Sequence, residues 1–390
     1  MIKKILLLVM DGLGIGSYEN KIYNSFANAE SKYRQAKIPA LEKLGLRNLL
    51  NNTSSRNSKS YIACIGKTKQ QSAFCESFSA HREMPGVVAT QGYSFSTDMI
   101  DKLLNRMHKN NINLIGGYNC YHNLSNISED IMYLHAKSAV PVVVTSFQEE
   151  PITTLGLLSY EEVIPHEKLV AIAYKIKALL STSDNVGRIV IKSFNRILGK
   201  RNFAHLSNRT DISIFKPLGP NLLDAIVNTG RTTMAAGKIC GLFNGYGFTH
   251  SHTSWENQTI FKDTLEMFNE TCNGLVWTNF NSLDRPYGHS KDVKNWIESL
   301  ELFDSYISEM LNKITRDDLL IITGDHGCDP VLAGFHTKEW NPLLVYNPKL
   351  TPKFLSNRNH SDIAATIADC FNLKFRCKNG KSFYNVLKFN

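Results

Sequence analysis

Three short apolar runs, each followed within a few residues by an aspartate, constrain the fold of this 390-residue chain more than any other feature. The runs are Ile5–Met10, Leu275–Thr278 and Asp318–Ile322, and their lengths suit buried strands rather than helices. Helical patterns over Phe261–Thr271 and Asp292–Leu311 alternate with them, which favours a parallel sheet. We therefore predict an α/β fold with a central, mostly parallel sheet flanked by helices.

The carboxyl ends of parallel strands meet at one edge of a sheet, where open α/β folds bind their ligands. Three carboxylates and three imidazoles are expected at that edge: Asp11, Asp284, His289, Asp325, His326 and His336. Oxygen and nitrogen donors of these kinds bind divalent transition metals. One such residue alone is more often structural, but six at one edge suit two metal ions about 3.5 to 4 Å apart that share a phosphoryl group.

The middle of the chain indicates a second domain, because its pattern changes after residue 92. Ala139–Val144 and Gly187–Lys192 have the composition of strands, and Glu167–Leu180 has the periodicity of an amphipathic helix. A chain of this length also exceeds the usual size of one domain. The expected parts are residues 1–92 (core), 93–219 (an inserted α+β cap domain that binds substrate) and 220–390 (the metal-binding part of the core).

Two other segments carry expectations that a structure can test. Asn51–Ser79 is rich in Ser, Asn, Lys and Gln and lacks apolar periodicity, which predicts loop or short irregular elements. Thr233–Ile239 is predicted to be a strand that carries Lys238 near its end.

Composition narrows the class of partner and the compartment. The formal net charge is +9, but the Lys and Arg residues are scattered and no aromatic-basic motif typical of nucleic-acid binding is present. The eight cysteines are dispersed without a C-x-x-C pair, which predicts reduced thiols and a cytoplasmic protein. Asp11 interrupts an apolar start that is short for a signal peptide, and no run reaches membrane-spanning length. We expect no nucleic-acid or membrane partner, and we favour a monomer.

The motifs resemble those of the phosphopentomutase family within the alkaline phosphatase superfamily. The segments that carry the resemblance are Asp11-Gly-Leu-Gly-Ile-Gly16, Asp284-Arg-Pro-Tyr-Gly-His289, Asp325-His-Gly-Cys-Asp-Pro330 and His336-Thr-Lys-Glu-Trp-Asn-Pro-Leu-Leu344, with cap segments such as Glu162–Pro165 and Ser207–Asp211. The resemblance implies an alkaline-phosphatase-like core. It also implies interconversion of ribose or deoxyribose 1-phosphate and 5-phosphate, with two divalent ions, usually Mn²⁺, and a sugar bisphosphate as activator. Zn²⁺ and Mg²⁺ stay open as alternatives.

The resemblance further implies roles for individual residues. The phosphorylated threonine of the family lies in an Asp-Thr-x-Thr-Gly-His-Trp-Glu segment, and the matching segment here is Glu76-Ser-Phe-Ser-Ala-His-Arg-Glu83, so Ser77 is the expected nucleophile. Positions that bind phosphate and sugar in the family correspond to Gln148, Lys192, Arg209 and Lys238. Glu149 is an alternative to Gln148, and a lysine at 192 replaces a bidentate arginine with a point charge.

These observations predict a metal-dependent phosphopentomutase that works through a phosphoserine and a bisphosphate intermediate. One ion would be held by Asp11, Asp325 and His326 with Ser77, and the other by Asp284, His289 and His336. A metal-dependent phosphatase or phosphodiesterase, a mutase for another sugar phosphate, and a non-catalytic binding protein are the alternatives.

Overall fold

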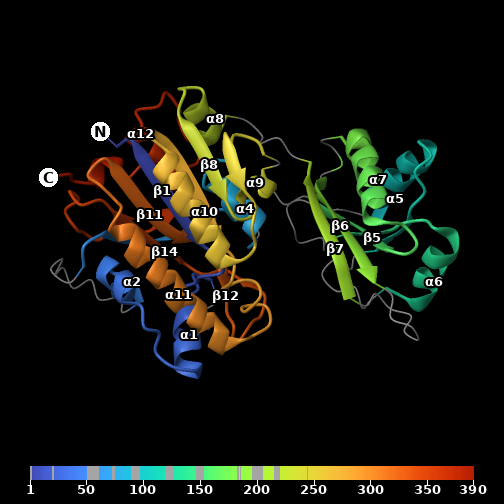
Figure 1. Ribbon diagram of the computed structural model, residues 1–390, viewed down its shortest axis with the longest axis horizontal. Coiled ribbons are helices and arrows are strands. Elements are labelled where there is room, and N and C mark those ends of the chain that lie inside the picture. The colour runs from blue at the N-terminus through green and yellow to red at the C-terminus, as the bar shows by residue number, and fades with distance from the viewer. Residues whose placement is uncertain are drawn as a thin grey trace. The chain divides into compact units, whose positions relative to one another are not determined.

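The computed structural model describes residues 2–19, 22–50, 61–72, 75–88, 97–118, 127–145, 153–181, 184, 186–195, 205–214, 220–243 and 245–390. Two compact units make up the chain (Figure 1). The first unit comprises residues 1–90 and 217–390, and the second comprises residues 91–216.

An eight-stranded sheet forms the centre of the first unit. Its strands are β1 (Lys4–Met10), β2 (Cys64–Lys69), β8 (Thr232–Ala236), β9 (His250–His252), β10 (Gly274–Phe280), β11 (Asp318–Gly324), β14 (Asn341–Tyr346) and β15 (Arg358–Asn359). The order across the sheet is β15-β2-β14-β11-β1-β10-β8-β9. Five neighbouring strands from β11 to β9 are parallel, whereas β14 is antiparallel to both β11 and β2. A mixed, mostly parallel sheet with helices confirms the predicted fold class.

The central strand β1 explains why its sequence is apolar without alternation. Leu6, Leu8 and Met10 belong to the hydrophobic core on one face of the sheet, whereas Leu7 and Val9 belong to the core on the other face. Successive side chains of a strand point to opposite faces, so a strand covered on both faces needs an uninterrupted apolar run. The helices that cover the sheet are α1 (Ser25–Lys32), α2 (Pro39–Leu44), α3 (Leu46–Leu50), α4 (Ser77–Glu83), α8 (Leu222–Val227), α9 (Ile239–Leu242), α10 (Asn257–Glu270), α11 (Val293–Leu311) and α12 (His360–Cys370) (Figure 1).

The second unit has its own sheet and its own core. Its strands are β3 (Ile115–Tyr118), β4 (Val142–Thr145), β5 (Thr153–Tyr160), β6 (Val186–Asn195) and β7 (His205–Ser213), which lie in this order. Its helices are α5 (Thr97–Lys109), α6 (Glu129–Ser138) and α7 (His166–Leu179). Leu169, Ala173 and Ile176 of α7 are buried against the sheet residues Leu157 and Ile189.

The structure corrects two local expectations. The segment 51–79 is not loop throughout, because β2 pairs with β14 and β15 and α4 begins at Ser77. Strand β8 ends at Ala236 rather than Ile239, because Gly237 has a φ of +80° and a Cβ there would meet the backbone oxygen of Asn279 at 2.5 Å. Lys238 therefore lies in the turn after the strand. Among the helices described here, none is long and apolar enough to cross a membrane.

Candidate metal centre

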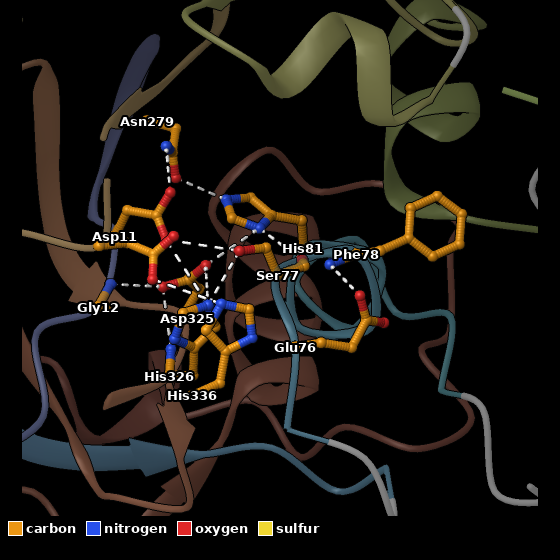
Figure 2. A network of polar contacts seen from close by, with 12 residues as sticks. Asp11, Gly12, Glu76, Ser77, Phe78, His81, Asn279, Asp325, His326 and His336 are labelled. Atoms are coloured by element: carbon orange, nitrogen blue, oxygen red, sulfur yellow. Dashed lines mark hydrogen bonds and ion pairs between the residues drawn. The ribbon is translucent and has the colours of Figure 1, made fainter. Parts of the chain in front are cut away.

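The parallel strands β1, β10 and β11 bring three aspartates to one edge of the sheet. Asp11 follows β1, Asp284 lies four residues after β10, and Asp325 follows β11. All three residues are buried, with at most 5% of their surface exposed. Three imidazoles and the Ser77 hydroxyl lie beside the aspartates there, and Figure 2 shows Asp11, Asp325, His326, His336 and Ser77.

The first group of donors consists of Asp11, Asp325 and His326, whose ligand atoms lie within 4.8 Å of one another. The Nε2 atom of His326 lies 3.6 Å from Oδ1 of Asp11 and 3.3 Å from Oδ2 of Asp325. The hydroxyl of Ser77 enters this group, since its Oγ lies 2.9 Å from Nε2 of His326 and 3.4 Å from Oδ1 of Asp11 (Figure 2). These are the four residues predicted for the first ion.

The second group consists of Asp284, His289 and His336. Oδ1 of Asp284 lies 3.2 Å from Nε2 of His289 and 3.4 Å from Nε2 of His336, and the two Nε2 atoms are 3.2 Å apart. His336 belongs to a separate ribbon of β12 (Gly327–Cys328) and β13 (His336–Thr337), which is not part of the main sheet. Cys328 of that ribbon also falls within reach of Asp284 and His289.

Backbone contacts aim the imidazoles and one carboxylate into the centre. Nδ1 of His326 donates to the carbonyl of Gly327 at 3.1 Å, and Nδ1 of His289 donates to the carbonyl of Gly334 at 3.0 Å. Because the proton is then on Nδ1, each Nε2 is left with a lone pair for a metal. Oδ1 of Asp325 accepts from the backbone nitrogens of Gly12 and His326, which leaves Oδ2 facing the other donors.

The donor set fits divalent cations. Oδ1 of Asp284 and Oδ2 of Asp325 are buried and have no hydrogen-bond partner among the described residues. Buried carboxylate oxygens without partners are costly unless a cation or a proton faces them. Carboxylates and neutral imidazoles are ligands that Mn²⁺ and Zn²⁺ accept, so the residues present suit the metals that the motifs imply.

Lys238 adds a positive charge beside the first group. Its Nζ contacts Oδ2 of Asp11 and lies 2.8 Å from Oγ of Ser77. Burial alone would raise the pKa of Asp11, but the ammonium of Lys238 holds that pKa below its usual value. Burial, together with the charge of Asp11, raises the pKa of Asp325 to about 7. Burial lowers the pKa of His326 to about 3, so this ring is a neutral ligand at physiological pH.

The helix α4 presents Ser77 at its first residue. Glu76 caps the helix, since its carboxylate accepts from the backbone nitrogens of Phe78 and Ser79 at 3.0 and 2.7 Å. An Asp or a Ser is the usual residue at such a cap, and the longer Glu76 satisfies the same amides here. The cap fixes where the helix begins and therefore where the hydroxyl of Ser77 lies.

Sequence reasoning missed several residues that touch this centre. His81 and Asn279 lie between Ser77 and Asp11, and both are fully buried (Figure 2). Glu339 is buried and accepts from the hydroxyls of Ser25 and Thr337, which ties the ribbon of His336 to the first βα connection. The position of His81 four residues after Ser77 was the available signal, since one helical turn separates i and i+4.

The predicted substrate-binding residues of the second unit are described only in part. Lys192 on β6 and Arg209 on β7 are direct cross-strand partners. Arg209 makes a two-pronged contact with Asp211, with Nε and Nη2 each 2.8 Å from a carboxylate oxygen. Gln148 and its alternative Glu149 lie outside the described residues.

Comparisons with known proteins agree with this centre. A family model described as the metalloenzyme superfamily matches residues 221–375. Solved structures with the same fold include a phosphoglycerate mutase of Leishmania mexicana, with a TM-score of 0.51 and 12% identity, which covers 100% of this chain and 98% of that one. A protein of Pyrococcus horikoshii has a TM-score of 0.50 and 16% identity, over 95% of this chain and 98% of that one. The α/β fold and the donor set therefore fit the metalloenzyme superfamily, whose model matches residues 221–375.

Curated relatives narrow the class to one family. A phosphopentomutase of Desulfitobacterium hafniense is 31% identical over 99% of this chain and 100% of its own length. One from Caldanaerobacter subterraneus is 30% identical over 96% of this chain and 95% of its own length. The chain belongs to the phosphopentomutase family, whose members are metal-dependent isomerases that transfer phosphoryl groups.

Proposed function

We propose that the chain interconverts the 1-phosphates and 5-phosphates of ribose and deoxyribose, with Ser77 carrying the transferring phosphoryl group. The observation that supports this most directly is the setting of the Ser77 hydroxyl, whose Oγ lies 2.9 Å from Nε2 of His326 and 2.8 Å from Nζ of Lys238. Negative charge that develops on this oxygen would face an ammonium and a metal-binding group, which is how serine hydroxyls become nucleophiles. Membership of the phosphopentomutase family supports the reaction class.

Two divalent cations would be held at this centre by groups of three residues: Asp11, Asp325 and His326 with the Ser77 hydroxyl, and Asp284, His289 and His336. Mn²⁺ suits this set of donors, with Zn²⁺ and Mg²⁺ as alternatives. When bound, the cations favour the ionised serine and stabilise charge on the transferring phosphoryl oxygens.

The chain's own residues would carry the transfer in two halves. In the first half, the 5-hydroxyl of the pentose 1-phosphate, or the 1-hydroxyl of the 5-phosphate, attacks the phosphorus of phosphoserine 77 and gives up its proton. The bond from phosphorus to Oγ breaks, Oγ takes up a proton, and a sugar bisphosphate forms. The bisphosphate then turns round, and Oγ of Ser77 attacks the other phosphate and takes its phosphoryl group. Lys238 would donate to Oγ whenever that oxygen is the leaving group or the nucleophile. An unphosphorylated chain would need a sugar bisphosphate to prime it.

We further propose that residues 93–219 act as a substrate-binding cap. Lys192 and Arg209 face each other across β6 and β7, so two cations could bind the phosphate that is not transferred. Gln148 or Glu149 would contact the sugar. Lys238 would contact the phosphoryl group in transfer, because its ammonium already lies beside Ser77.

The decisive experiment measures whether the phosphoryl group moves from the 1-position of the sugar to the 5-position. Protein loaded with Mn²⁺ and primed with a trace of sugar bisphosphate is incubated with ribose 1-phosphate, deoxyribose 1-phosphate or a hexose 1-phosphate, and products are followed by phosphorus NMR. We expect the 5-phosphate of each pentose and no release of inorganic phosphate. Release of inorganic phosphate would show a phosphatase instead, and preferred conversion of the hexose would show a mutase for another sugar.

The nucleophile is tested separately by mass. Priming should add one phosphoryl group to the intact chain, and peptide mapping should place it on Ser77. Ser77→Ala should abolish turnover while metal binding is largely kept, because the other donors stay. Ser77→Thr should stay active if the neighbouring packing accepts one methyl, since threonine keeps the hydroxyl and is the residue of the family at this position. A label on Ser72 or Ser79, or turnover without any phosphoprotein, would contradict the assignment.

A further inference from the structure

A closed ring of polar contacts joins the nucleophile to the first metal group. His81 lies one turn after Ser77 on α4, is fully buried, and has Nδ1 2.7 Å from the backbone oxygen of Ser77. Its Nε2 lies 2.8 Å from Oδ1 of Asn279. Nδ2 of Asn279 donates to Oδ2 of Asp11 at 3.1 Å, and Oδ1 of Asp11 lies 3.4 Å from the Ser77 hydroxyl (Figure 2).

The direction of each contact is set by the carboxylate. An ionised carboxylate only accepts hydrogen bonds, so the amide nitrogen of Asn279 must face Asp11, and the amide oxygen must face His81. Nδ2 of Asn279 also donates to the side-chain oxygen of Asn281 at 2.8 Å, which supports the same orientation. Nε2 of His81 is therefore the donor to Asn279. Nδ1 faces the carbonyl oxygen of Ser77, which can also only accept, so both ring nitrogens carry a proton when the ring of contacts is closed.

Two different elements meet through this pair of side chains. Asn279 is in β10 of the main sheet, and His81 is in α4, which carries the nucleophile. The ring of His81 stacks on Trp277, also of β10, with centroids 6.0 Å apart and planes at 20°. Packing against Trp277 thus keeps the His81 ring nearly parallel to the indole, and the hydrogen bond to Asn279 fixes the direction in which Nε2 points.

We infer that His81 and Asn279 are positioning residues that hold the backbone of Ser77 at a fixed distance from Asp11. The inference rests on the function proposed above. A serine lacks the β-methyl that restricts χ1 of a threonine, so its hydroxyl is directed less by its own rotamer and more by where its backbone is held. The ring through Asp11, Asn279 and His81 provides that restraint, and a misplacement of about 1 Å can cost about 100-fold in rate.

The test uses substitutions that keep one nitrogen of His81 at a time. The amide nitrogen of a glutamine can take the place of Nε2, whereas that of an asparagine can take the place only of Nδ1. His81→Gln should therefore keep the contact with Asn279. It loses the Nδ1 contact, but the helical backbone of α4 still joins residue 81 to Ser77, so kcat should stay within about fivefold of the parent. His81→Asn and Asn279→Ala should each lower kcat about 10- to 100-fold with KM for the sugar phosphate unchanged. The double variant His81→Asn, Asn279→Ala should have a kcat no lower than that of the poorer single variant, because both changes open the same ring of contacts.

Metal affinity gives a readout that does not depend on turnover. Titration calorimetry with Mn²⁺ should show binding at one of two sites weakened about tenfold in His81→Asn and Asn279→Ala, since support of a ligand is worth about 10- to 100-fold. The other site, at Asp284, His289 and His336, should be unchanged.

His135 of the second unit supplies a matched control. It is equally buried, with Nδ1 2.8 Å from the backbone oxygen of Val140 and Nε2 3.0 Å from the backbone nitrogen of Tyr160. His135→Asn should lower thermal stability but leave Mn²⁺ affinity and kcat within about twofold. If His81→Asn behaves like this control, or if His81→Gln and His81→Asn lose equal activity, the inference is wrong. If the parent chain itself neither becomes phosphorylated nor turns over, the proposed function fails instead.

Discussion

Replacing Lys238 by Met should destabilise the metal-free protein much more than the metal-loaded protein. The side chains of Lys238 and Asp11 are only 12% and 2% exposed, and the ammonium contacts the carboxylate directly. Removing one partner of a buried ion pair costs about 3 to 5 kcal/mol. The lower figure is expected here because Asn279 still donates to Asp11 at 3.1 Å. At about 2 to 4 °C per kcal/mol, the metal-free variant should melt about 6 to 12 °C below the parent.

With Mn²⁺ bound, the carboxylate of Asp11 would face a dication, so the free energy of unfolding lost in Lys238→Met should shrink to about 1 kcal/mol or less. The assay is thermal unfolding of parent and variant, each with chelator and with excess Mn²⁺. Lys4→Met is the control, because Lys4 lies 3.7 Å from the buried carboxylate of Asp318 at the other end of the parallel strands. The free energy of unfolding that Lys4→Met loses should be the same with and without metal. Equal losses for Lys238→Met in both conditions would refute the argument that a cation binds at Asp11.

Further predictions concern the second ion, pH and the cap. The double variant Asp284→Ala, His289→Ala should retain about one divalent ion per chain by elemental analysis, and retention of two would exclude these ligands. The pKa of Asp325 is raised to about 7, so the metal-free centre holds a proton below that pH. Because Mn²⁺ must displace this proton, its affinity measured by calorimetry should rise up to about tenfold per pH unit towards pH 7 and then level off. An affinity that does not change with pH would contradict this prediction. Arg209→Ala should raise KM for a pentose phosphate about 10- to 100-fold and leave a small aryl phosphate unaffected, whereas equal losses would indicate a role in the chemistry or in folding.

The core strands could be predicted from the sequence because their signal is local. Apolar runs such as Ile5–Met10 are buried on both faces, so the run itself defines the strand. The same holds for the aspartates that follow β1 and β11, since the end of a parallel strand puts the next residue at the ligand-binding edge. Fold class and the position of Asp11 and Asp325 therefore needed no knowledge of distant contacts.

Other parts depend on distant contacts that no local pattern reveals. Strand β2 has polar residues such as Lys67 and Thr68, and it becomes a strand because β14 and β15 pair with it on both sides. Lys238 lies beyond its strand because the chain turns at Gly237, where φ is +80° and where the Cβ of another residue would lie only 2.5 Å from the backbone oxygen of Asn279. Asn279 lies just past the apolar run Leu275–Thr278 and has no local signal, because only the approach of α4 gives its amide a partner in His81.

Charge at the sheet edge links the fold to the proposed chemistry. Asp11, Asp284 and Asp325 bring three negative charges into a buried space, and the ammonium of Lys238 contacts the carboxylate of Asp11 there. In the form that binds metal, with all three carboxylates ionised and the imidazoles neutral, this cluster has a net charge of about minus two, which would repel a phosphate dianion. Two divalent cations reverse the charge to about plus two, which attracts the same dianion. Metal binding at this edge thus both relieves the repulsion among the carboxylates and creates the field that a transferring phosphoryl group requires.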